Sequence, residues 1–206
     1  MGAGGGYEHE HGKSMQLTLP FRPAVAEDAP VLAELVNAAG DGLPLYLWER
    51  MAGPGVTAWD VGYRRAMREE GSFSYRNAII IESDGQCAGC LIGYPVPDMP
   101  EPISSQMPPM FFPLQELENL APSTWYVNVL AVLPQFRNNG LGSKLLHLAD
   151  EIAASLRCQG LSVIVSDANS EARRLYERSG YSQIATRKML KDSWENDGQN
   201  WVLLTK

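Results

Sequence analysis

The chain has 206 residues, of which 45% are hydrophobic and 20% charged, a composition typical of a globular protein. This length predicts one large domain with a substantial core, over residues 15–206. The formal net charge of −7 argues against a nucleic-acid partner and against binding to an anionic membrane surface. No apolar run is long enough to cross a bilayer, so no membrane-spanning helix is expected.

The N-terminal segment has a composition unlike the rest of the chain. Residues 1–14 are rich in glycine, carry His9 and His11, and lack the apolar centre of a signal peptide. We interpret this segment as a disordered tail or a cloning remnant and expect a cytoplasmic protein.

Three cysteines, Cys87, Cys90 and Cys158, are too few for a disulfide framework. Cys87 and Cys90 have the spacing of a metal or redox pair, but no second pair follows them. They lie within a predicted strand, where residues three apart point to opposite faces. We therefore expect buried thiols and no metal site.

The first half of the chain predicts a mixture of strands and helices. Proline near the start of a helix and glycine at its end set the boundaries, as Pro30 and Gly40 do here. The predicted elements are a strand over residues 16–24, a helix from 27 to 40, an aromatic and turn-rich segment over 43–56, a helix over 57–70, and a hairpin of 77–82 with 86–94 about Asp84-Gly85.

The segment 95–122 contains eight prolines, which exclude regular structure apart from a helical turn at about 114–120. Strong strands are predicted on both sides of it. We therefore interpret it as a functional loop or an insertion and not as a linker.

The second half alternates strands and helices, which implies parallel pairing within an α/β sheet flanked by helices. The predicted elements are a strand over 124–132, an amphipathic helix to about 157, a strand over 161–166, a helix over 170–178, and a final strand pair of 182–189 with 201–205.

Between the strand 124–132 and the helix lies the stretch Arg137-Asn138-Asn139-Gly140-Leu141-Gly142-Ser143. A helix N-terminus exposes unpaired N–H groups and the positive end of the helix dipole. Glycines let the backbone approach an anion closely, and Arg137 adds a cation, so the turn indicates a pyrophosphate site. A dinucleotide fingerprint needs glycine where Leu145 stands, and a Walker loop needs Gly-Lys-Ser or Gly-Lys-Thr in place of Gly142-Ser143-Lys144.

The order Arg137-x-x-Gly140-x-Gly142 resembles the acyl-CoA loop of the GCN5-related N-acetyltransferase (GNAT) family. A second match follows a helix and a strand later, where residues 169–181, Asn-Ser-Glu-Ala-Arg-Arg-Leu-Tyr-Glu-Arg-Ser-Gly-Tyr, resemble the family's Asn-x-x-Ala-x-x-Leu-Tyr-x-x-x-Gly-Phe/Tyr segment. Residues 130–134 resemble the strand exit of the family, and residues 21–29 its start. The resemblance covers nearly the whole chain and is weakest across residues 43–122.

The resemblance implies a single-domain mixed sheet whose central parallel strands splay around acetyl-CoA. It implies an N-acetyltransferase that moves acetyl from acetyl-CoA, the co-substrate, to a primary amine by direct attack through a tetrahedral intermediate. Tyr176 would protonate the leaving thiolate, and a backbone N–H of the strand would polarise the thioester carbonyl. The cofactor-binding residues implied are Leu130, Ala131 and Val132 for the pantetheine arm, Arg137, Asn138, Asn139, Gly140, Leu141, Gly142 and Ser143 for the pyrophosphate, and Asn169 near the pantetheine.

Each of these residues also has a purely structural interpretation. Tyr176 shares a helical face with apolar residues and fits a core aromatic, Asn169 fits an N-cap, and Arg137 fits a solvated surface charge. The predicted strand 124–132 contains no acid to deprotonate the amine, which leaves open a non-catalytic acyl-CoA-binding module. The base is left open among a water chain and three glutamates, Glu82, Glu116 and Glu118.

The acceptor would be a small-molecule or peptide amine. The loop 95–122 carries four acids and no Lys or Arg, and with nearby aromatic residues it suits a cationic amine. A solvated acidic loop beside core aromatics explains the same residues, and a homodimer stays open. The residues concerned are Asp98, Glu101, Glu116, Glu118, Met99, Met107, Met110, Phe111, Phe112, Tyr46, Trp48 and Trp59.

Overall fold

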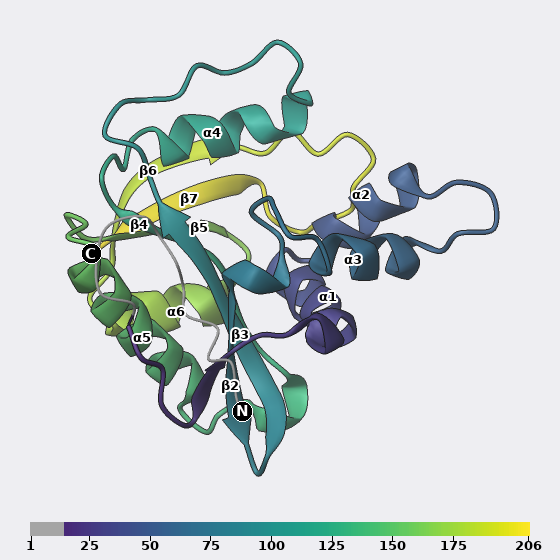
Figure 1. The fold of residues 1–206 in the computed structure, drawn as a ribbon. Coiled ribbons are helices and arrows are strands. Elements are labelled where there is room, and N and C mark those ends of the chain that lie inside the picture. Colours follow the sequence, from purple (N-terminus) through teal and green to yellow (C-terminus); the bar gives the residue numbers. More distant parts are fainter. Residues whose placement is uncertain (1–14) are drawn as a thin grey trace. The chain divides into compact units, whose positions relative to one another are not determined.

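A computed structural model describes residues 15–206, and the predicted N-terminal tail lies outside them (Figure 1). The described chain divides into two compact units, residues 15–93 with Val129–Leu145 and Tyr94–Asn128 with Leu146–Lys206. The strands form a seven-stranded sheet in the order β1-β2-β3-β4-β5-β7-β6, with parallel and antiparallel pairs. The predicted mixed α/β sheet is confirmed.

The strands of the first unit pair antiparallel. β1 (Phe21–Pro23) pairs with β2 (Ala78–Ser83), and β2 pairs with β3 (Gln86–Pro95). The predicted hairpin is confirmed, since Asp84 and Gly85 both have positive φ, 52° and 72°, as a tight hairpin turn requires. β1 is shorter than predicted, because the Phe21 N–H donates to the Thr18 carbonyl at 2.9 Å in a turn that precedes the strand.

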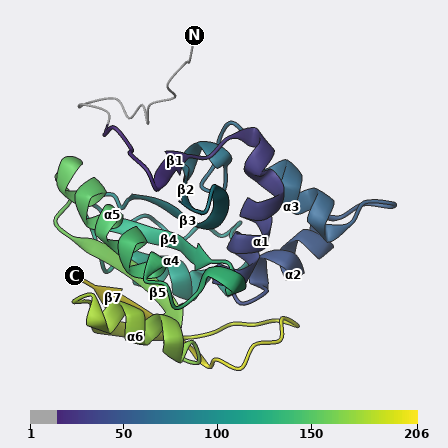
Figure 2. The same cartoon turned by 90° about the horizontal axis from the view of Figure 1, so that it is seen from below.

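Three helices accompany these strands in the first unit (Figure 2). They are α1 (Ala29–Ala39), α2 (Leu43–Met51) and α3 (Ala58–Ala66), with single 3₁₀ turns at Ala26–Asp28 and Tyr75–Asn77. The turn-rich interpretation of residues 43–56 is wrong for α2. Pro44 stands in the first helical turn, where a missing N–H costs nothing, and Gly42 supplies the N-cap with φ 83°. Thr57 and Asp60 form a capping box that starts α3, which ends four residues before the predicted Glu70.

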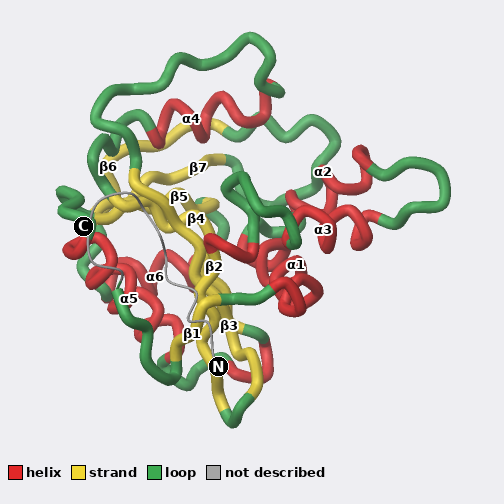
Figure 3. The backbone as a smooth tube through the Cα atoms, viewed as in Figure 1, coloured by secondary structure: helices red, strands yellow, loops and turns green. Residues whose placement is uncertain are grey.

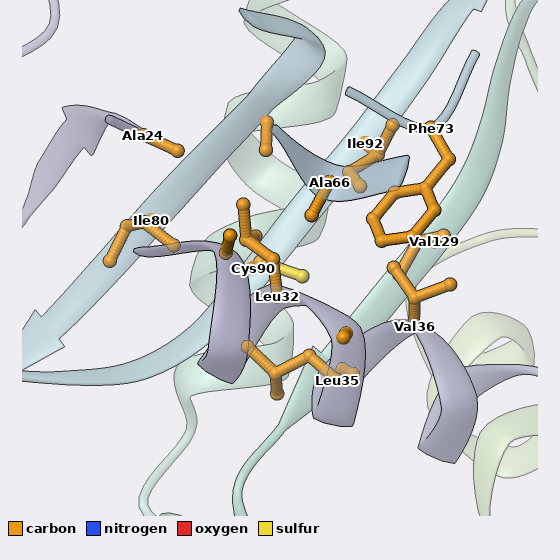
Figure 4. Close-up of a cluster of buried hydrophobic side chains, with 14 of the residues drawn as sticks. Ala24, Leu32, Leu35, Val36, Ala66, Phe73, Ile80, Cys90, Ile92 and Val129 are labelled. Atoms are coloured by element: carbon orange, nitrogen blue, oxygen red, sulfur yellow. The ribbon is translucent and has the colours of Figure 1, made fainter. Parts of the chain in front are cut away.

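The core of the first unit lies between α1 and the strands (Figure 4). Leu32 and Leu35 of α1 are fully or almost fully buried, as are Ile80 of β2 and Ile92 of β3. Trp48 of α2 is 3% exposed and stacks on Phe73 with ring centroids 5.9 Å apart. The aromatic residues of α2 therefore belong partly to the core.

The cysteine pair takes part in this packing. Cys90 is buried as predicted, whereas Cys87 and Cys158 are only partly buried. Burial raises the pKa of the Cys87 thiol to about 11 and that of Cys90 further, so both stay protonated at neutral pH. Across residues 15–206, no three His, Cys, Asp or Glu side chains lie together as metal ligands would.

The second unit contains the remaining strands, in elements that match the predicted ones within two residues. The parts are β4 (Trp125–Val132, which passes into the first unit after Asn128), α5 (Leu141–Ser155, which begins in the first unit), β5 (Leu161–Ser166), α6 (Ser170–Arg178), β6 (Ser182–Lys188) and β7 (Asn200–Thr205). β5 and β7 pair antiparallel, as do β6 and β7. None of the helices within residues 15–206 has both the length and the apolar character that a bilayer crossing requires. The cytoplasmic location stays a prediction.

The proline-rich segment forms a folded loop and a short helix. A 3₁₀ turn, Pro109–Phe111, leads into α4 (Phe112–Glu118), which packs on β6 and β7 and confirms the predicted helical turn (Figure 3). The side chain of Asn119 closes the loop before α4 by accepting from the Glu101 N–H at 3.0 Å and donating to the Glu101 carbonyl at 2.8 Å. The segment is therefore a folded loop with a short helix, and its interpretation as a functional loop or an insertion stays a prediction.

A close approach of two strands in the first unit gives a test of this packing. A Cβ at Gly89 would overlap the Ala131 carbonyl oxygen and lie 3.1 Å from the Val132 Cα, so Gly89→Ala must push the two backbones apart. We expect it to lower the free energy of unfolding by about 1–3 kcal/mol, measured by urea denaturation. Gly53→Ala is the control, because nothing lies within 4 Å of its Cβ position. Equal stabilities of the two variants would contradict this packing.

Candidate functional site

The strands β4 and β5 start as a tightly held parallel pair in the second unit. The Gln159 N–H donates to the Ser123 carbonyl at 2.8 Å, and the Trp125 N–H donates to the Gly160 carbonyl at 2.9 Å. The buried hydroxyls of Thr124 and Ser162 lie 2.7 Å apart in a hydrogen bond. These contacts hold the two strands together where they begin.

The pairing ends almost at once. Trp125 pairs with Leu161 and Tyr126 with Ser162, and the described residues of β4 that follow in this unit, Val127 and Asn128, have no paired residue in β5. On its other edge β5 pairs with β7 over five consecutive residues, so β5 itself stays regular. Where two parallel strands part, their facing N–H and C=O groups need other partners. This geometry can accept the backbone-like amides of a ligand.

In the first unit, β4 ends at the predicted cofactor loop. Ala131 is buried in the core, while Leu130 and Val132 are half-buried on the opposite face of the strand. A 3₁₀ turn, Pro134–Phe136, follows and leads to residues 137–140, all of which are exposed.

The loop itself presents backbone donors. Asn138 and Gly140 have left-handed φ values of 63° and 74°, and the first helical bond of α5 runs from the Lys144 N–H to the Gly140 carbonyl at 3.1 Å. The N–H groups of Leu141, Gly142 and Ser143 therefore precede the first donor of the helix and have no acceptor within it. They lie at the positive end of the helix dipole and are chemically suited to an anion.

Two side chains of the loop form hydrogen bonds with nearby backbone carbonyls. The Arg137 Nε donates to the Val132 carbonyl at 3.2 Å, and the Asn139 Nδ2 donates to the Phe136 carbonyl at 3.3 Å. The Arg137 bond leaves its terminal nitrogens available for a phosphate. Arg137 is exposed, so its role as a cofactor ligand or as a surface charge stays a prediction.

Asn169 and Tyr176 lie on α6 in the second unit, whereas the predicted residues from Leu130 to Ser143 all lie in the first. The Asn169 Oδ1 accepts the Ala172 N–H at 3.1 Å, which confirms the N-cap interpretation and leaves its Nδ2 as a donor. The cofactor contact of Asn169 stays a prediction.

Tyr176 is buried, and its ring lies 5.4 Å from that of Tyr181. Burial raises the pKa of the Tyr176 hydroxyl well above its usual range, so it keeps its proton at neutral pH. Its ring packs as a core aromatic would, and of the two tyrosines it is the Tyr181 hydroxyl that is buried without a hydrogen-bond partner among residues 15–206. Tyr176 therefore combines an apolar setting with a protonated hydroxyl.

The three candidate bases differ in their partners. Glu82 accepts from Arg22 at 2.7 Å, and Glu116 accepts from Arg187 at 2.6 Å. Glu118 instead accepts a hydrogen bond of 2.9 Å from the hydroxyl of Tyr94. Sequence reasoning missed Tyr94, because the two residues are 24 positions apart and only the fold brings them together.

Comparison with known proteins identifies the fold. Residues 45–181 match the model of the "Acetyltransferase (GNAT) family". The chain is similar to a protein described as an acetyltransferase, with 22% identity, a TM-score of 0.61, and coverage of 90% of this chain and 97% of the other. It is also similar to an N-acetyltransferase from Staphylococcus aureus Mu50 (18% identity, TM-score 0.60, coverage of 90% and 99%) and to a ribosomal-protein-alanine N-acetyltransferase from Brucella melitensis (19%, 0.55, 90% and 98%). At these identities the structural likeness establishes the fold.

The N-cap of α6 can be tested apart from any ligand. Asn169→Ala removes the acceptor of the Ala172 N–H and should lower the free energy of unfolding by about 1 kcal/mol, measured by thermal or urea denaturation. Asn169→Asp keeps that acceptor and should stay close to the wild type. If Asn169→Asp lost as much stability as Asn169→Ala, the cap would not be what Asn169 contributes.

Proposed function

The chain belongs to the GNAT acetyltransferase family, and we propose that it transfers the acetyl group of acetyl-CoA to a primary amine by direct attack through a tetrahedral intermediate. Family membership supports acetyl-CoA as the co-substrate. The observation that carries the catalytic proposal is the buried Tyr176 hydroxyl on α6, whose pKa burial raises and which therefore holds its proton firmly.

In this proposal the cofactor is held mainly by backbone. The pantetheine amides bind along the end of β4, at Leu130, Ala131 and Val132. The pyrophosphate binds the N–H groups of the loop from Arg137 to Ser143, with the Arg137 guanidinium beside it. The exposed loop and its two left-handed residues support this role. Asn169 would contribute its Nδ2 to the pantetheine region while its Oδ1 stays on the helix.

The chemistry then needs three contributions. The amine attacks the thioester carbonyl, and a backbone N–H of β4 stabilises the oxyanion as a fixed dipole. The C–S bond breaks as the intermediate collapses, and Tyr176 gives its proton to the sulfur. Because the thiolate leaves inside the protein, away from water, it is more basic than a free thiolate and accepts the proton more readily.

We propose a small-molecule or peptide amine as the acceptor. The insertion before β4 supports an amine with a cationic portion, since it carries acids and no Lys or Arg. Two of those acids are engaged locally, Asp98 by the Ser123 hydroxyl at 2.6 Å and Glu116 by Arg187, so the attraction would come from the net charge of the segment.

The direct test is release of CoA in the presence of a panel of amines, from small diamines to peptides with free N-termini. An amine acetyltransferase releases CoA and forms the amide with at least one of them, in amounts that match. Binding of acetyl-CoA without release under any condition would establish the non-catalytic module instead.

The loop's role predicts the effect of a substitution at Gly140. Gly140→Val forces a β-branched residue into a left-handed φ of 74° and crowds the anion, so acetyl-CoA affinity should fall at least tenfold in titration calorimetry. Gly55→Val is a matched control, because Gly55 has φ 75° and, like Gly140, nothing within 4 Å of its Cβ position. It should carry similar backbone strain and bind acetyl-CoA normally. A Gly140→Val variant with the affinity of Gly55→Val would remove the loop from the site.

Replacing Tyr176 tests the general acid. Tyr176→Phe keeps the ring and its packing, so kcat should fall by roughly a hundredfold while acetyl-CoA affinity stays near normal. The effect is at the low end of the usual range because a thiol, with a pKa of about 8.5, is already a tolerable leaving group. Tyr181→Phe is the control, since Tyr181 is the buried neighbour of Tyr176. Full turnover of Tyr176→Phe in a reaction limited by chemistry would make Tyr176 a core aromatic only.

A further inference from the structure

The second unit contains a cluster of side chains that neither the cofactor loop nor the general acid accounts for. Glu118 at the end of α4 accepts a hydrogen bond of 2.9 Å from the Tyr94 hydroxyl. The ring of Tyr94 packs against that of Tyr126 on β4, with centroids 5.4 Å apart and an angle of 56°. The cluster therefore connects α4 to Tyr126, the last residue of β4 that pairs with β5.

Tyr126 of this cluster is also affected by Tyr176, the residue proposed as the acid. Burial raises the pKa of Tyr126 well above its usual range, and the nearby Glu118 and Tyr176 raise it further. The Glu118 carboxyl and the Tyr176 hydroxyl are therefore both near enough to Tyr126 to disfavour its ionisation.

Glu118 also differs from the other acids in what surrounds it. Burial raises the pKa of its carboxyl above the usual value, the Tyr94 hydrogen bond lowers it, and Glu101 adds to the rise. Glu82 and Glu116 are each ion-paired to an arginine. Within the described part of the chain Glu118 alone of the three has no cationic partner, so its carboxylate is the one available to accept a proton.

The strands packed on α4 bring no other titratable group to Glu118. β5 and β7 carry none, and β6 carries Arg187, which binds Glu116, and Lys188, which points to the opposite face of the strand. The protonation of Glu118 is therefore set by its burial, by the Tyr94 hydrogen bond and by Glu101.

We propose that Glu118 is the general base that accepts the proton of the attacking amine, and that Tyr94 is a positioning residue that holds its carboxylate. The inference rests on the proposed amine acetyltransfer. As the amine nitrogen bonds to the carbonyl carbon, its proton passes to the Glu118 carboxylate. The C–S bond then breaks and the sulfur takes the proton of Tyr176. Protonated Glu118 and ionised Tyr176 return to their resting states by exchanging protons with water.

The base must be unprotonated to act, so kcat/KM should fall as pH falls through the pKa of Glu118. Glu118→Gln keeps the shape and still accepts from Tyr94, yet should lower kcat/KM about a hundredfold and abolish that acid limb. Tyr94→Phe removes the hydrogen bond that favours the carboxylate, which raises the pKa of Glu118, so the limb should move to higher pH. A merely structural Glu118 would give neither change.

Glu116→Gln is the matched control, because it removes an acid of the same helix that is bound by Arg187, and its acid limb should stay at the wild-type pH even if its KM for a cationic amine rises. All variants are assayed with one amine, so that the amine's own ionisation cancels, and their acetyl-CoA affinity and melting temperature are measured alongside. If Glu118→Gln folds, binds acetyl-CoA and keeps the wild-type rate and acid limb, or if Tyr94→Phe leaves the limb in place, Glu118 is not the base. The two proposals fail in different ways. Wild-type protein that acetylates no amine would overturn the proposed acetyl transfer, whereas an active wild type with an unaffected Glu118→Gln variant would overturn only the role of Glu118 as the base.

Discussion

Two buried hydroxyl groups, those of Thr124 and Ser162, form a hydrogen bond of 2.7 Å at the point where β4 and β5 begin, and the strands separate two residues later. A pair of parallel strands whose hydrogen bonding ends after two residues depends on strong contacts where it begins, since each backbone group that loses its strand partner needs another one. The bonds of Gln159 and Trp125 to the facing strand add to that start. On its other edge β5 pairs with β7 from Ser162 to Ser166, so that edge of β5 stays regular. The proposed binding of a pantetheine arm along β4 depends on this arrangement.

Local chemistry made much of this fold predictable from the sequence. Asp84-Gly85 specifies a hairpin by its backbone preferences, and the glycines around residue 40 end α1. Prediction failed where one residue type fits two structures. Pro44 suits a turn as well as the first turn of a helix, and the packing of Trp48 into the core decided for α2. The fold class was accessible because alternating strands and helices allow few arrangements.

In the candidate site, too, some residues could be predicted from the sequence and others could not. The glycine loop and the segment that begins at Asn169 are contiguous motifs, so the sequence was enough to single them out. The surroundings of the acids depend on tertiary contacts, and three glutamates looked alike until their partners were known. Tyr94 is the clearest case, because a tyrosine at the end of a strand has no sequence signature that links it to Glu118 on α4.

Burial affects the proposed acid, Tyr176, and the proposed base, Glu118, in the same way, although the acid must donate a proton and the base must accept one. Removal from water disfavours a charged side chain, which raises the pKa of both the Tyr176 phenol and the Glu118 carboxyl. For a phenol this means that the proton stays until a strongly basic group, such as a desolvated thiolate, takes it. For a carboxylate it means a greater readiness to accept a proton from the amine. The Tyr94 hydrogen bond moderates the second effect, since it favours the charged carboxylate and keeps part of Glu118 unprotonated and able to act. Burial is therefore compatible with both an acid that must stay protonated and a base that must stay unprotonated, because the base accepts a hydrogen bond that stabilises its charge.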